Sequence, residues 1–370
     1  MHLNFLNYEH LVAKLFKVLI LTKFVKPMKV AKLYDFGDIR IEEIPTPEIG
    51  DDEMLVKVKA CGICSSDTMK WYIKKKAPLV IGHELAGVVV EVGSKVNKFK
   101  QGDRVFVHHH APCMECRYCK RGNYVMCDVW RKSKIIPGGI AEYVKVPNVN
   151  LRNDTLKLPD GVSFEDGAIV EPVACSVKAF KRAGIREGDY IVVLGLGFMG
   201  QVNVKLAKFY GAEIIIGVDK VKYRLEKAIE NGADYVIDFS SENVKDRVLE
   251  FTNGYGADIV IVGPGTIEAI KMGLELVAKG GKLILFTPTP DDAKLEIKPY
   301  EIYFNEISII PSYSAGPDDT AEALNLISKG IVKASSVFSI LNLCVTRFSA
   351  FTIPLLIKFN ASAVSSGPAE

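Results

Sequence analysis

The sequence lacks a large charge of either sign, and it lacks a hydrophobic run long enough to cross a membrane. Its 370 residues include 47 lysines and arginines and 44 acidic residues, which leaves a formal charge of +3. A nucleic-acid-binding surface needs concentrated basic charge, and this near balance predicts none. A membrane helix needs about 20 apolar residues and a secretory signal about 7–15, and neither fits the mildly apolar N-terminus. We therefore expect no nucleic-acid partner and no membrane association.

Histidine is scarce, and its distribution limits the positions that can supply an imidazole for catalysis. Of six histidines, two fall in the first ten residues, three are adjacent at His108, His109 and His110, and His83 stands alone. A mechanism that needs an imidazole must use His83 or the triplet. The length and the composition, 48% hydrophobic and 25% charged, are typical of a globular chain with about two domains.

The two ends of the chain differ from the rest. Four residues at helical spacing predict a short amphipathic helix near the N-terminus: Leu11, Leu15, Val18 and Leu19. We treat residues 1–27 as an extension. After Ser335 the only charged residues are Arg347, Lys358 and Glu370, and the apolar residues follow neither the helical nor the strand period. This tail is atypical of a folded domain.

Half of the eight cysteines are concentrated in one short segment. They follow the spacing C-x2-C-x2-C-x7-C: Cys113, Cys116, Cys119 and Cys127. Clustered thiols in a chain without an export signal usually bind metal, so we expect a cytoplasmic protein. Four thiolates match a closed tetrahedral zinc site. Because protein ligands fill every position, we predict a structural zinc in a lobe over residues 113–127.

The predicted secondary-structure pattern changes near residue 176. Before that point, short β segments alternate with glycine, which predicts a barrel-like β domain. After it, short apolar strands alternate with helical segments, which is typical of a doubly wound parallel sheet and an α/β fold. The clearest predicted strands lie at 54–60, 86–92 and 104–108 in the first part, and at 190–194, 214–218, 235–237, 259–262 and 282–286 in the second.

A glycine motif lies between a predicted strand and a predicted helix. The strand 190–194 leads directly into Gly195-Leu196-Gly197-Phe198-Met199-Gly200, and the helix is expected over 201–210. In this position the first glycine permits a tight turn, the second allows backbone to approach a pyrophosphate, and the third allows helix and strand to pack closely. We predict a dinucleotide site whose contacts include Gly195, Gly197, Phe198, Met199 and Gly200.

Asp219 closes the next predicted strand, nineteen residues beyond the last glycine of the motif. A carboxylate there accepts hydrogen bonds from the adenosine ribose hydroxyls and repels a 2′-phosphate, so NAD is favoured over NADP. Nearby Lys220, Lys222 and Arg224 leave some use of NADP open.

A second set of metal-ligand residues is dispersed along the chain. Cys64 lies in Cys61-Gly-Ile-Cys64, His83 and Glu84 follow Gly82, and Glu171 precedes Pro172. Each residue alone is weak evidence, because a lone histidine is more often a core residue and a glutamate before proline is often a cap. Together they offer a thiolate, an imidazole and a carboxylate. Three protein ligands leave one position open, which is the arrangement of a catalytic zinc.

In this order the motifs resemble the zinc-dependent medium-chain alcohol dehydrogenase family, over about residues 28–333. The resemblance implies a barrel-like, GroES-like catalytic domain followed by a Rossmann domain. The expected boundaries are an extension over 1–27, a catalytic domain over 28–175, an NAD-binding domain over 176–311, and a segment over 312–370 that returns to the catalytic domain. The Glu171-Pro172 pair resembles the polyol and threonine dehydrogenase branch.

The resemblance also implies roles for individual residues. Catalytic zinc is expected on Cys64, His83 and Glu171. Glu84 is expected as a close neighbour that can exchange with water as a zinc ligand. Two zinc ions and one NAD are then expected per chain. Zinc lowers the pKa of the substrate hydroxyl, and a hydride passes from the alcohol carbon to the nicotinamide. Ser66 is expected to start a proton relay.

Further expectations concern residues around the catalytic zinc. Asp67 is expected to orient the imidazole of His83. Met69 occupies a position where many family members have a relay histidine, so His109 is one candidate for another proton route, and an ordinary exposed histidine is the alternative. Trp71 and Tyr72 either wall the pocket or pack in the core.

The resemblance predicts an edge strand over 302–310 that pairs two chains, so we expect a homo-oligomer, a dimer or a tetramer. The leading function is an NAD-dependent alcohol or polyol dehydrogenase with a small-molecule substrate. L-threonine 3-dehydrogenase shares nearly every motif and stays open. A catalytically inactive homologue acting as a binding protein is the alternative of another class, because the tail after 335 departs from the family pattern.

Overall fold

Antiparallel strands form the N-terminal part of the chain. A computed structural model describes residues 26–337 and 346–347. The strands of this part are β1 (Pro27–Asp35), β2 (Asp38–Pro45), β3 (Met54–Gly62), β4 (Leu79–Val80), β5 (Glu84–Val92), β6 (Arg104–His108), β7 (Tyr143–Val146), β8 (Thr155–Lys157) and β15 (Thr346–Arg347). They form a three-stranded sheet of order β2-β1-β4 and a larger sheet of order β15-β3-β5-β6-β8, with β7 paired to β3.

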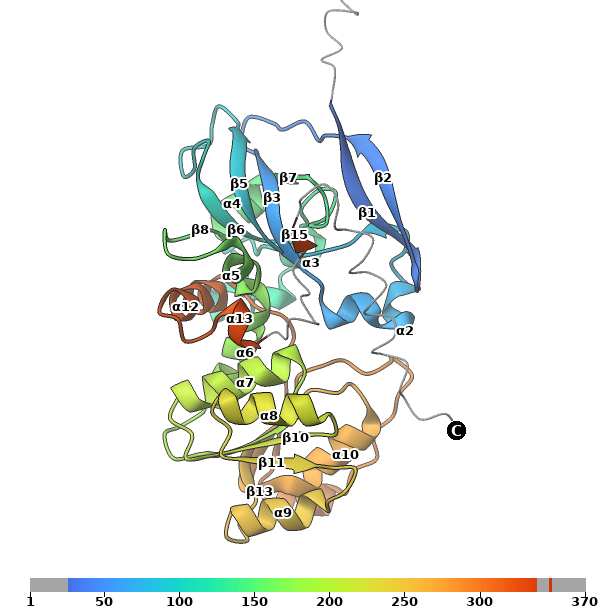
Figure 1. Cartoon of the computed structure of the whole chain (residues 1–370), viewed down its shortest axis with the longest axis vertical. Coiled ribbons are helices and arrows are strands. Elements are labelled where there is room, and N and C mark those ends of the chain that lie inside the picture. Colours follow the sequence, from blue (N-terminus) through green and yellow to red (C-terminus); the bar gives the residue numbers. More distant parts are fainter. Residues whose placement is uncertain (1–25, 338–345, 348–370) are drawn as a thin grey trace, which may run out of the picture.

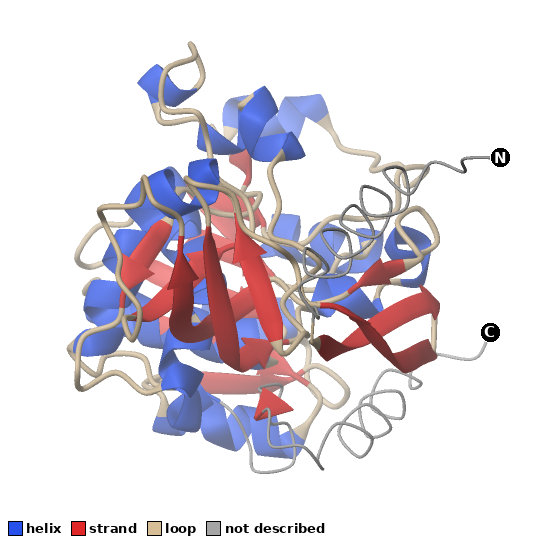
Figure 2. Cartoon of the chain, turned by 90° about the horizontal axis from the view of Figure 1, so that it is seen from above, coloured by secondary structure: helices blue, strands red, loops and turns tan. Residues whose placement is uncertain are grey.

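The core of this part lies between its strands and the loops that cover them. Val56 on β3, Val89 on β5 and Val105 on β6 are fully buried in one cluster. Short helical segments connect the strands: η1 (Ser65–Thr68), α2 (Lys70–Ile73), η2 (Cys119–Arg121), η3 (Tyr124–Met126), α3 (Asp128–Lys132), α4 (Asn148–Asn153) and α5 (Phe164–Ala168). In Figure 2, the view from above, the three-stranded sheet lies beside the larger one.

A six-stranded parallel sheet organises the second part. Its order is β11-β10-β9-β12-β13-β14. The strands are β9 (Tyr190–Leu194), β10 (Ile214–Asp219), β11 (Tyr235–Asp238), β12 (Ala257–Val262), β13 (Val277–Leu285) and β14 (Ser308–Pro311). The chain first builds outward from β9 to β11 and then continues on the other side of β9. The order therefore reverses beside β9, and in such sheets ligands bind at the carboxyl ends of the strands at this point.

Helices cover both faces of the parallel sheet. They are α6 (Val170–Ala183), α7 (Phe198–Phe209), α8 (Lys222–Glu230), α9 (Val244–Phe251), α10 (Ile267–Leu276), α11 (Pro299–Phe304), α12 (Pro317–Ser328) and α13 (Ala334–Val337). Alternate residues of β9 point to opposite faces: Ile191 packs in the cluster that holds α6, α7 and α12, and Val192 packs in the cluster that holds α9 and α10. Figure 1 shows α6, α12 and α13 between the two parts.

The structure confirms the predicted fold class and most predicted strands. Strands 104–108 and 190–194 match residue for residue, and the other predicted strands are extended at one or both ends or shifted by a few residues. The predicted edge strand over 302–310 is wrong in its bounds. Pro299 starts helix α11, Glu306 has a left-handed φ of 51° that ends it, and only residues 308–311 form β14. The strand does lie at the end of the sheet.

The described C-terminal residues approach the N-terminal part. β15 pairs antiparallel with β3, with Thr346 opposite Cys61. The predicted amphipathic helix within residues 1–27 and most of the atypical tail lie outside the described residues. Within 26–337 and 346–347, no helix combines the length and apolar character that crossing a membrane requires.

Candidate active site and metal centres

The four clustered cysteines form a compact group of sulfur atoms. The Sγ atoms of Cys116 and Cys119 are 3.5 Å apart, and those of Cys113 and Cys127 are 3.6 Å apart. All four lie within 4.8 Å of one another, and all are free thiols. Tetrahedral zinc with bonds of about 2.3 Å places its sulfur ligands about 3.8 Å apart. The predicted structural site therefore has the donor set and the spacing for zinc.

The surroundings of the cysteines also favour a cation. The backbone N–H of Cys116 donates to Cys113 Sγ at 3.3 Å, and the N–H of Cys113 donates to Cys127 Sγ at 3.5 Å. Burial and hydrogen bonds with neighbouring thiols raise the pKa of Cys119 to about 12. Bound zinc would reverse this effect, because it stabilises thiolates. Trp130 and Val125 complete a small core under the lobe.

A second group joins Cys64, His83 and Glu84, whose ligand atoms lie within 4.8 Å of one another. Cys64 follows β3, and Glu84 begins β5 directly opposite Gly62. A Cβ at Gly62 would overlap Glu84 Oε2, so glycine at this position leaves room for the Glu84 carboxylate where it stands. Gly82 has a φ of +92° and turns the chain so that His83 enters the site.

The electrostatics of this group show an excess of negative charge. Burial, together with the charges of Glu171 and Asp67, raises the pKa of Cys64 to about 11, against a smaller lowering by hydrogen bonds from Ser66. Burial and the charges of Cys64 and Glu171 also raise the pKa of Glu84 well above its ordinary value. A divalent cation would relieve both effects, so the donor set fits a metal ion.

Glu171 lies beside this group but belongs to a third one. Its carboxylate and the rings of His108 and His109 have ligand atoms within 4.8 Å of one another. The family resemblance predicts Glu171 together with Cys64 and His83. The two groups adjoin, because the rings of His83 and His109 have centroids 4.7 Å apart. His108 is not among the predicted site residues, and the histidine run at the end of a predicted strand is the signal that could have identified it.

Ser66, Asp67 and Tyr72 lie close to the Cys64 group. Ser66 and Asp67 are in η1, and Asp67 accepts a hydrogen bond from the backbone N–H of Cys64 at 3.2 Å. Burial lowers the pKa of His83, but the charges of nearby carboxylates, Asp67 first, outweigh it and raise the pKa. Asp67 therefore acts on the His83 ring through its charge. Trp71 and Tyr72 on α2 are half-buried and meet edge to face.

The glycine motif forms a cradle at the start of α7. Gly195 has a φ of +83°, and Gly197 is the N-cap of α7. A Cβ at Gly200 would overlap the carbonyl oxygen of Gly195, whereas a Cβ at Gly197 would have no atom within 4 Å. Open space in front of the first backbone amides of a helix suits a pyrophosphate. The residues present therefore fit a dinucleotide.

Asp219 is buried at the end of β10, next to the motif. Its carboxylate accepts hydrogen bonds from the backbone N–H groups of Leu196 at 2.8 Å, Lys220 at 2.8 Å and Val221 at 2.9 Å. Arg224 Nη1 lies 3.5 Å from Asp219 Oδ2. The residue predicted to bind the ribose thus also fixes the turn of the glycine motif.

Comparisons with known proteins cover both parts of the chain. Residues 50–160 match the family model described as alcohol dehydrogenase GroES-like domain, and residues 199–329 match that described as zinc-binding dehydrogenase. The sorbitol dehydrogenase of Halalkalibacterium halodurans is 35% identical over 310 residues, which cover 81% of this chain and 88% of that protein. The chain belongs to the zinc-dependent medium-chain alcohol and polyol dehydrogenase family.

Solved structures of this family share the fold. A zinc-binding dehydrogenase from Sinorhizobium meliloti bound to NADP matches with a TM-score of 0.76 and 30% identity, over 83% of this chain and 90% of that one. A short chain alcohol dehydrogenase from Escherichia coli CFT073 complexed with NADH matches with a TM-score of 0.75 and 27% identity, over 84% and 90%.

Membership in the medium-chain family confirms several predictions. The chain is a zinc-dependent oxidoreductase of alcohols or polyols, its fold combines a GroES-like domain with a Rossmann domain, and its cofactors are zinc and a nicotinamide dinucleotide. The comparisons give no support to threonine 3-dehydrogenase or to an inactive binding protein over this function.

Proposed function

We propose that the protein interconverts a polyol or secondary alcohol and its ketone with NAD in the cytoplasm. The group of Cys64, His83 and Glu84 carries this proposal, because a thiolate, an imidazole and a carboxylate converge within 4.8 Å in a buried site. When bound, zinc supplies a Lewis acid that lowers the pKa of the substrate hydroxyl, and NAD accepts the hydride. The free thiols throughout the described chain support a reducing compartment.

The geometry favours Glu84 over Glu171 as the third ligand of the catalytic zinc. Glu84 lies in the same group as Cys64 and His83 and is held by the pairing of β3 with β5, whereas Glu171, equally buried, groups with His108 and His109. Glu171 acts on this group from a neighbouring position through its charge. We assign it to the rim of the catalytic site. We assign Ser66 as the group that receives the hydroxyl proton, and its hydrogen bond with Cys64 supports this role.

Asp219 supports a preference for NAD. It lies at the end of β10 with its carboxylate fixed by three backbone amides, so negative charge is held where a 2′-phosphate would lie. Arg224 lies at the exposed side of this carboxylate and offsets part of its charge. We expect NAD to give the higher kcat/KM, with measurable activity on NADP.

A substrate panel and one variant test this function. The panel contains sorbitol, butane-2,3-diol, threonine and benzyl alcohol, each with NAD and with NADP. We expect turnover of the polyols, which is the class named for the sorbitol dehydrogenase relative. Cys64→Ala should abolish turnover while the circular dichroism spectrum and the zinc of the cysteine lobe are retained. Wild-type rates in Cys64→Ala would refute the assignment.

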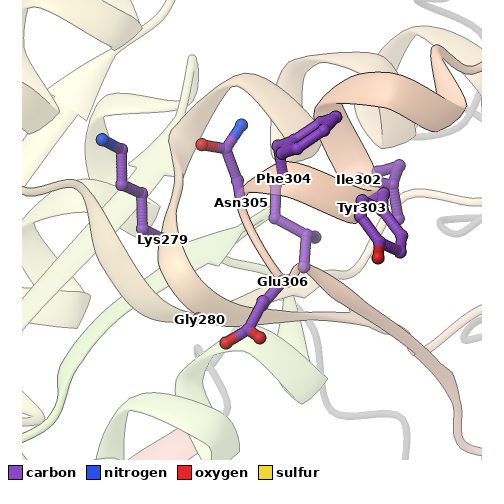
Figure 3. A pocket seen from close by; sticks show the side chains of 8 residues that line it. Lys279, Gly280, Ile302, Tyr303, Phe304, Asn305 and Glu306 are labelled. Atoms are coloured by element: carbon purple, nitrogen blue, oxygen red, sulfur yellow. The ribbon is translucent and has the colours of Figure 1, made fainter.

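We also propose that two copies associate through the edge strand β14 and helix α11. Three aromatic side chains on α11 are strongly exposed: Tyr300 (73%), Tyr303 (76%) and Phe304 (64%). They adjoin an open groove lined by Lys279, Gly280 and residues 302–307, which Figure 3 shows. Apolar side chains beside an unpaired strand edge favour a second copy as the occupant.

Light scattering during size-exclusion chromatography tests this association. We expect Tyr303→Asp to shift the protein toward the monomer. Tyr255→Asp is the matched control, because Tyr255 is also 74% exposed but lies between α9 and β12. An unchanged mass in Tyr303→Asp, or an equal shift in both variants, would contradict the proposed interface.

A further inference from the structure

His108, His109 and Glu171 converge beside the group of Cys64, His83 and Glu84. His108 is the last residue of β6, and the chain bends at His109 immediately after it. This bend allows two consecutive side chains, which would point to opposite faces in a regular strand, to reach the same cluster. Glu171 approaches from the first turn of α6. The three ligand atoms lie within 4.8 Å of one another.

The position of His108 is fixed by a chain of buried hydrogen bonds. Its Nδ1 lies 2.6 Å from Asp154 Oδ2, and the other oxygen of Asp154 accepts a hydrogen bond from the Thr320 hydroxyl at 2.6 Å. Nδ1 is thereby the protonated nitrogen, which leaves the Nε2 lone pair free. A histidine held by a carboxylate in this way is the usual arrangement around a metal ion.

The backbone of the two histidines is also held by hydrogen bonds. The side-chain amide of Asn150 donates to the carbonyl oxygens of His108 and His109, at 3.0 Å each. Asn150 is fully buried. The cluster is therefore built before any ligand arrives, which reduces the entropic cost of binding.

One ring nitrogen of each histidine lacks a hydrogen-bond partner. His108 Nε2 and His109 Nδ1 are both buried and unpaired within the described structure. Buried polar atoms in native proteins are nearly always satisfied, so a group of unpaired nitrogens beside a carboxylate indicates a missing partner. A cation satisfies lone pairs of this kind, and a water molecule is the competing explanation.

We propose that His108, His109 and Glu171 bind a second divalent metal ion beside the Cys64 group. Two imidazoles and one carboxylate favour zinc or a similar first-row ion over magnesium or calcium, and leave at least one position open. This ion lies beside the catalytic zinc, so the proposal rests on the proposed function for its neighbour. With the cysteine lobe, the chain then holds three metal ions.

Metal counting in the full-length protein tests the proposal. The purified protein is dialysed against a small excess of Zn²⁺, passed over a desalting column and analysed for zinc per chain. We expect three in the wild type and two in His109→Asn. His110→Asn is the matched control and should keep three, because His110 is the next residue but bonds to the Ser133 carbonyl outside the cluster. Two zinc ions in the wild type, or three in His109→Asn, would overturn the proposal.

Cobalt provides a second readout that depends on ligand chemistry. Co²⁺ added to protein that carries two zinc ions should give d–d absorption without a thiolate-to-cobalt charge-transfer band, because the cluster contains no sulfur. We expect this spectrum in the wild type and in His110→Asn, and its loss in His109→Asn. A thiolate band, or no bound cobalt, would count against the site and favour a water-filled cluster.

The same count separates this inference from the proposed function. Cys64→Ala should lose the catalytic zinc and retain the ion of the histidine cluster. If Cys64→Ala keeps all its zinc, the catalytic assignment fails. If His109→Asn keeps all its zinc while Cys64→Ala loses one, only the second site fails.

Discussion

Replacing Gly197 by alanine should weaken cofactor binding without unfolding the protein. Gly197 is the N-cap of α7, and its φ of −63° is ordinary for any residue. An added Cβ would meet no protein atom within 4 Å, so the folded chain has room for it. The stability should therefore change by less than about 1 kcal/mol. The added methyl group instead occupies the space through which a pyrophosphate approaches the backbone amides of α7.

The expected loss of affinity follows from the hydrogen bonds that this approach permits. A hydrogen bond to a charged group contributes about 1.5–3 kcal/mol, and displacement of the phosphates by one methyl group forfeits about one such bond. Since 1.4 kcal/mol is about tenfold in affinity, the dissociation constant for NADH should rise about ten- to hundredfold. Isothermal titration with NADH measures this change, and thermal unfolding measures the stability of the same samples.

Gly200→Ala is the matched control, because it adds the same methyl group three residues away. Its Cβ would overlap the carbonyl oxygen of Gly195, and neither backbone segment can move freely. We expect a destabilisation of about 1–3 kcal/mol, seen as a lower unfolding midpoint without cofactor. If Gly197→Ala binds NADH like the wild type, or if Gly200→Ala unfolds at the wild-type temperature, the account of the cradle is wrong.

Three other substitutions test the metal lobe and the contacts between the two parts. Cys116→Ser should release one zinc ion per chain and lower the unfolding midpoint, because the three remaining cysteines cannot fill all four positions around the zinc. Unchanged zinc content would contradict this. Thr320→Val should cost about 1–3 kcal/mol in urea denaturation, because it leaves a buried oxygen of Asp154 without its donor, and a neutral result would show that water replaces the hydroxyl. Lys75→Ala should leave the unfolding midpoint unchanged, because the ion pair with Asp291 is exposed. A large fall in the midpoint would show that this ion pair stabilises the contact between the two parts.

Local sequence patterns were sufficient for much of the fold and of the site. The strand 190–194 and the glycine motif follow from a short apolar run, a tight turn and a helix start, all of which are set by neighbouring residues. The cysteine lobe likewise depends on the spacing of four residues in one segment. In these places the local preference and the final structure agree.

Features that depend on distant contacts could not be predicted. Whether Glu171 ligates the catalytic zinc depends on how helix α6 is placed relative to the Cys64 group, which no local pattern describes. The role of His108 depends on Asp154, 46 residues away along the chain. The bounds of α11 were missed for another reason: the apolar residues of 302–310 match a strand, but Pro299 at the first helical turn starts a helix.

Helix α6 has a consequence for how this protein can change over evolution. Its first turn carries Glu171 to His108 and His109, and Gly184, directly after its last residue, leads toward the first strand of the parallel sheet. Each residue of an α-helix adds about 1.5 Å and about 100° of rotation. Deleting one residue from the fourteen-residue helix, between Glu171 and its C-terminal end, would rotate the Glu171 carboxylate about the helix axis relative to the rest of α6, away from His108 and His109. We therefore expect the length of α6 to stay constant when insertions and deletions change the surface loops.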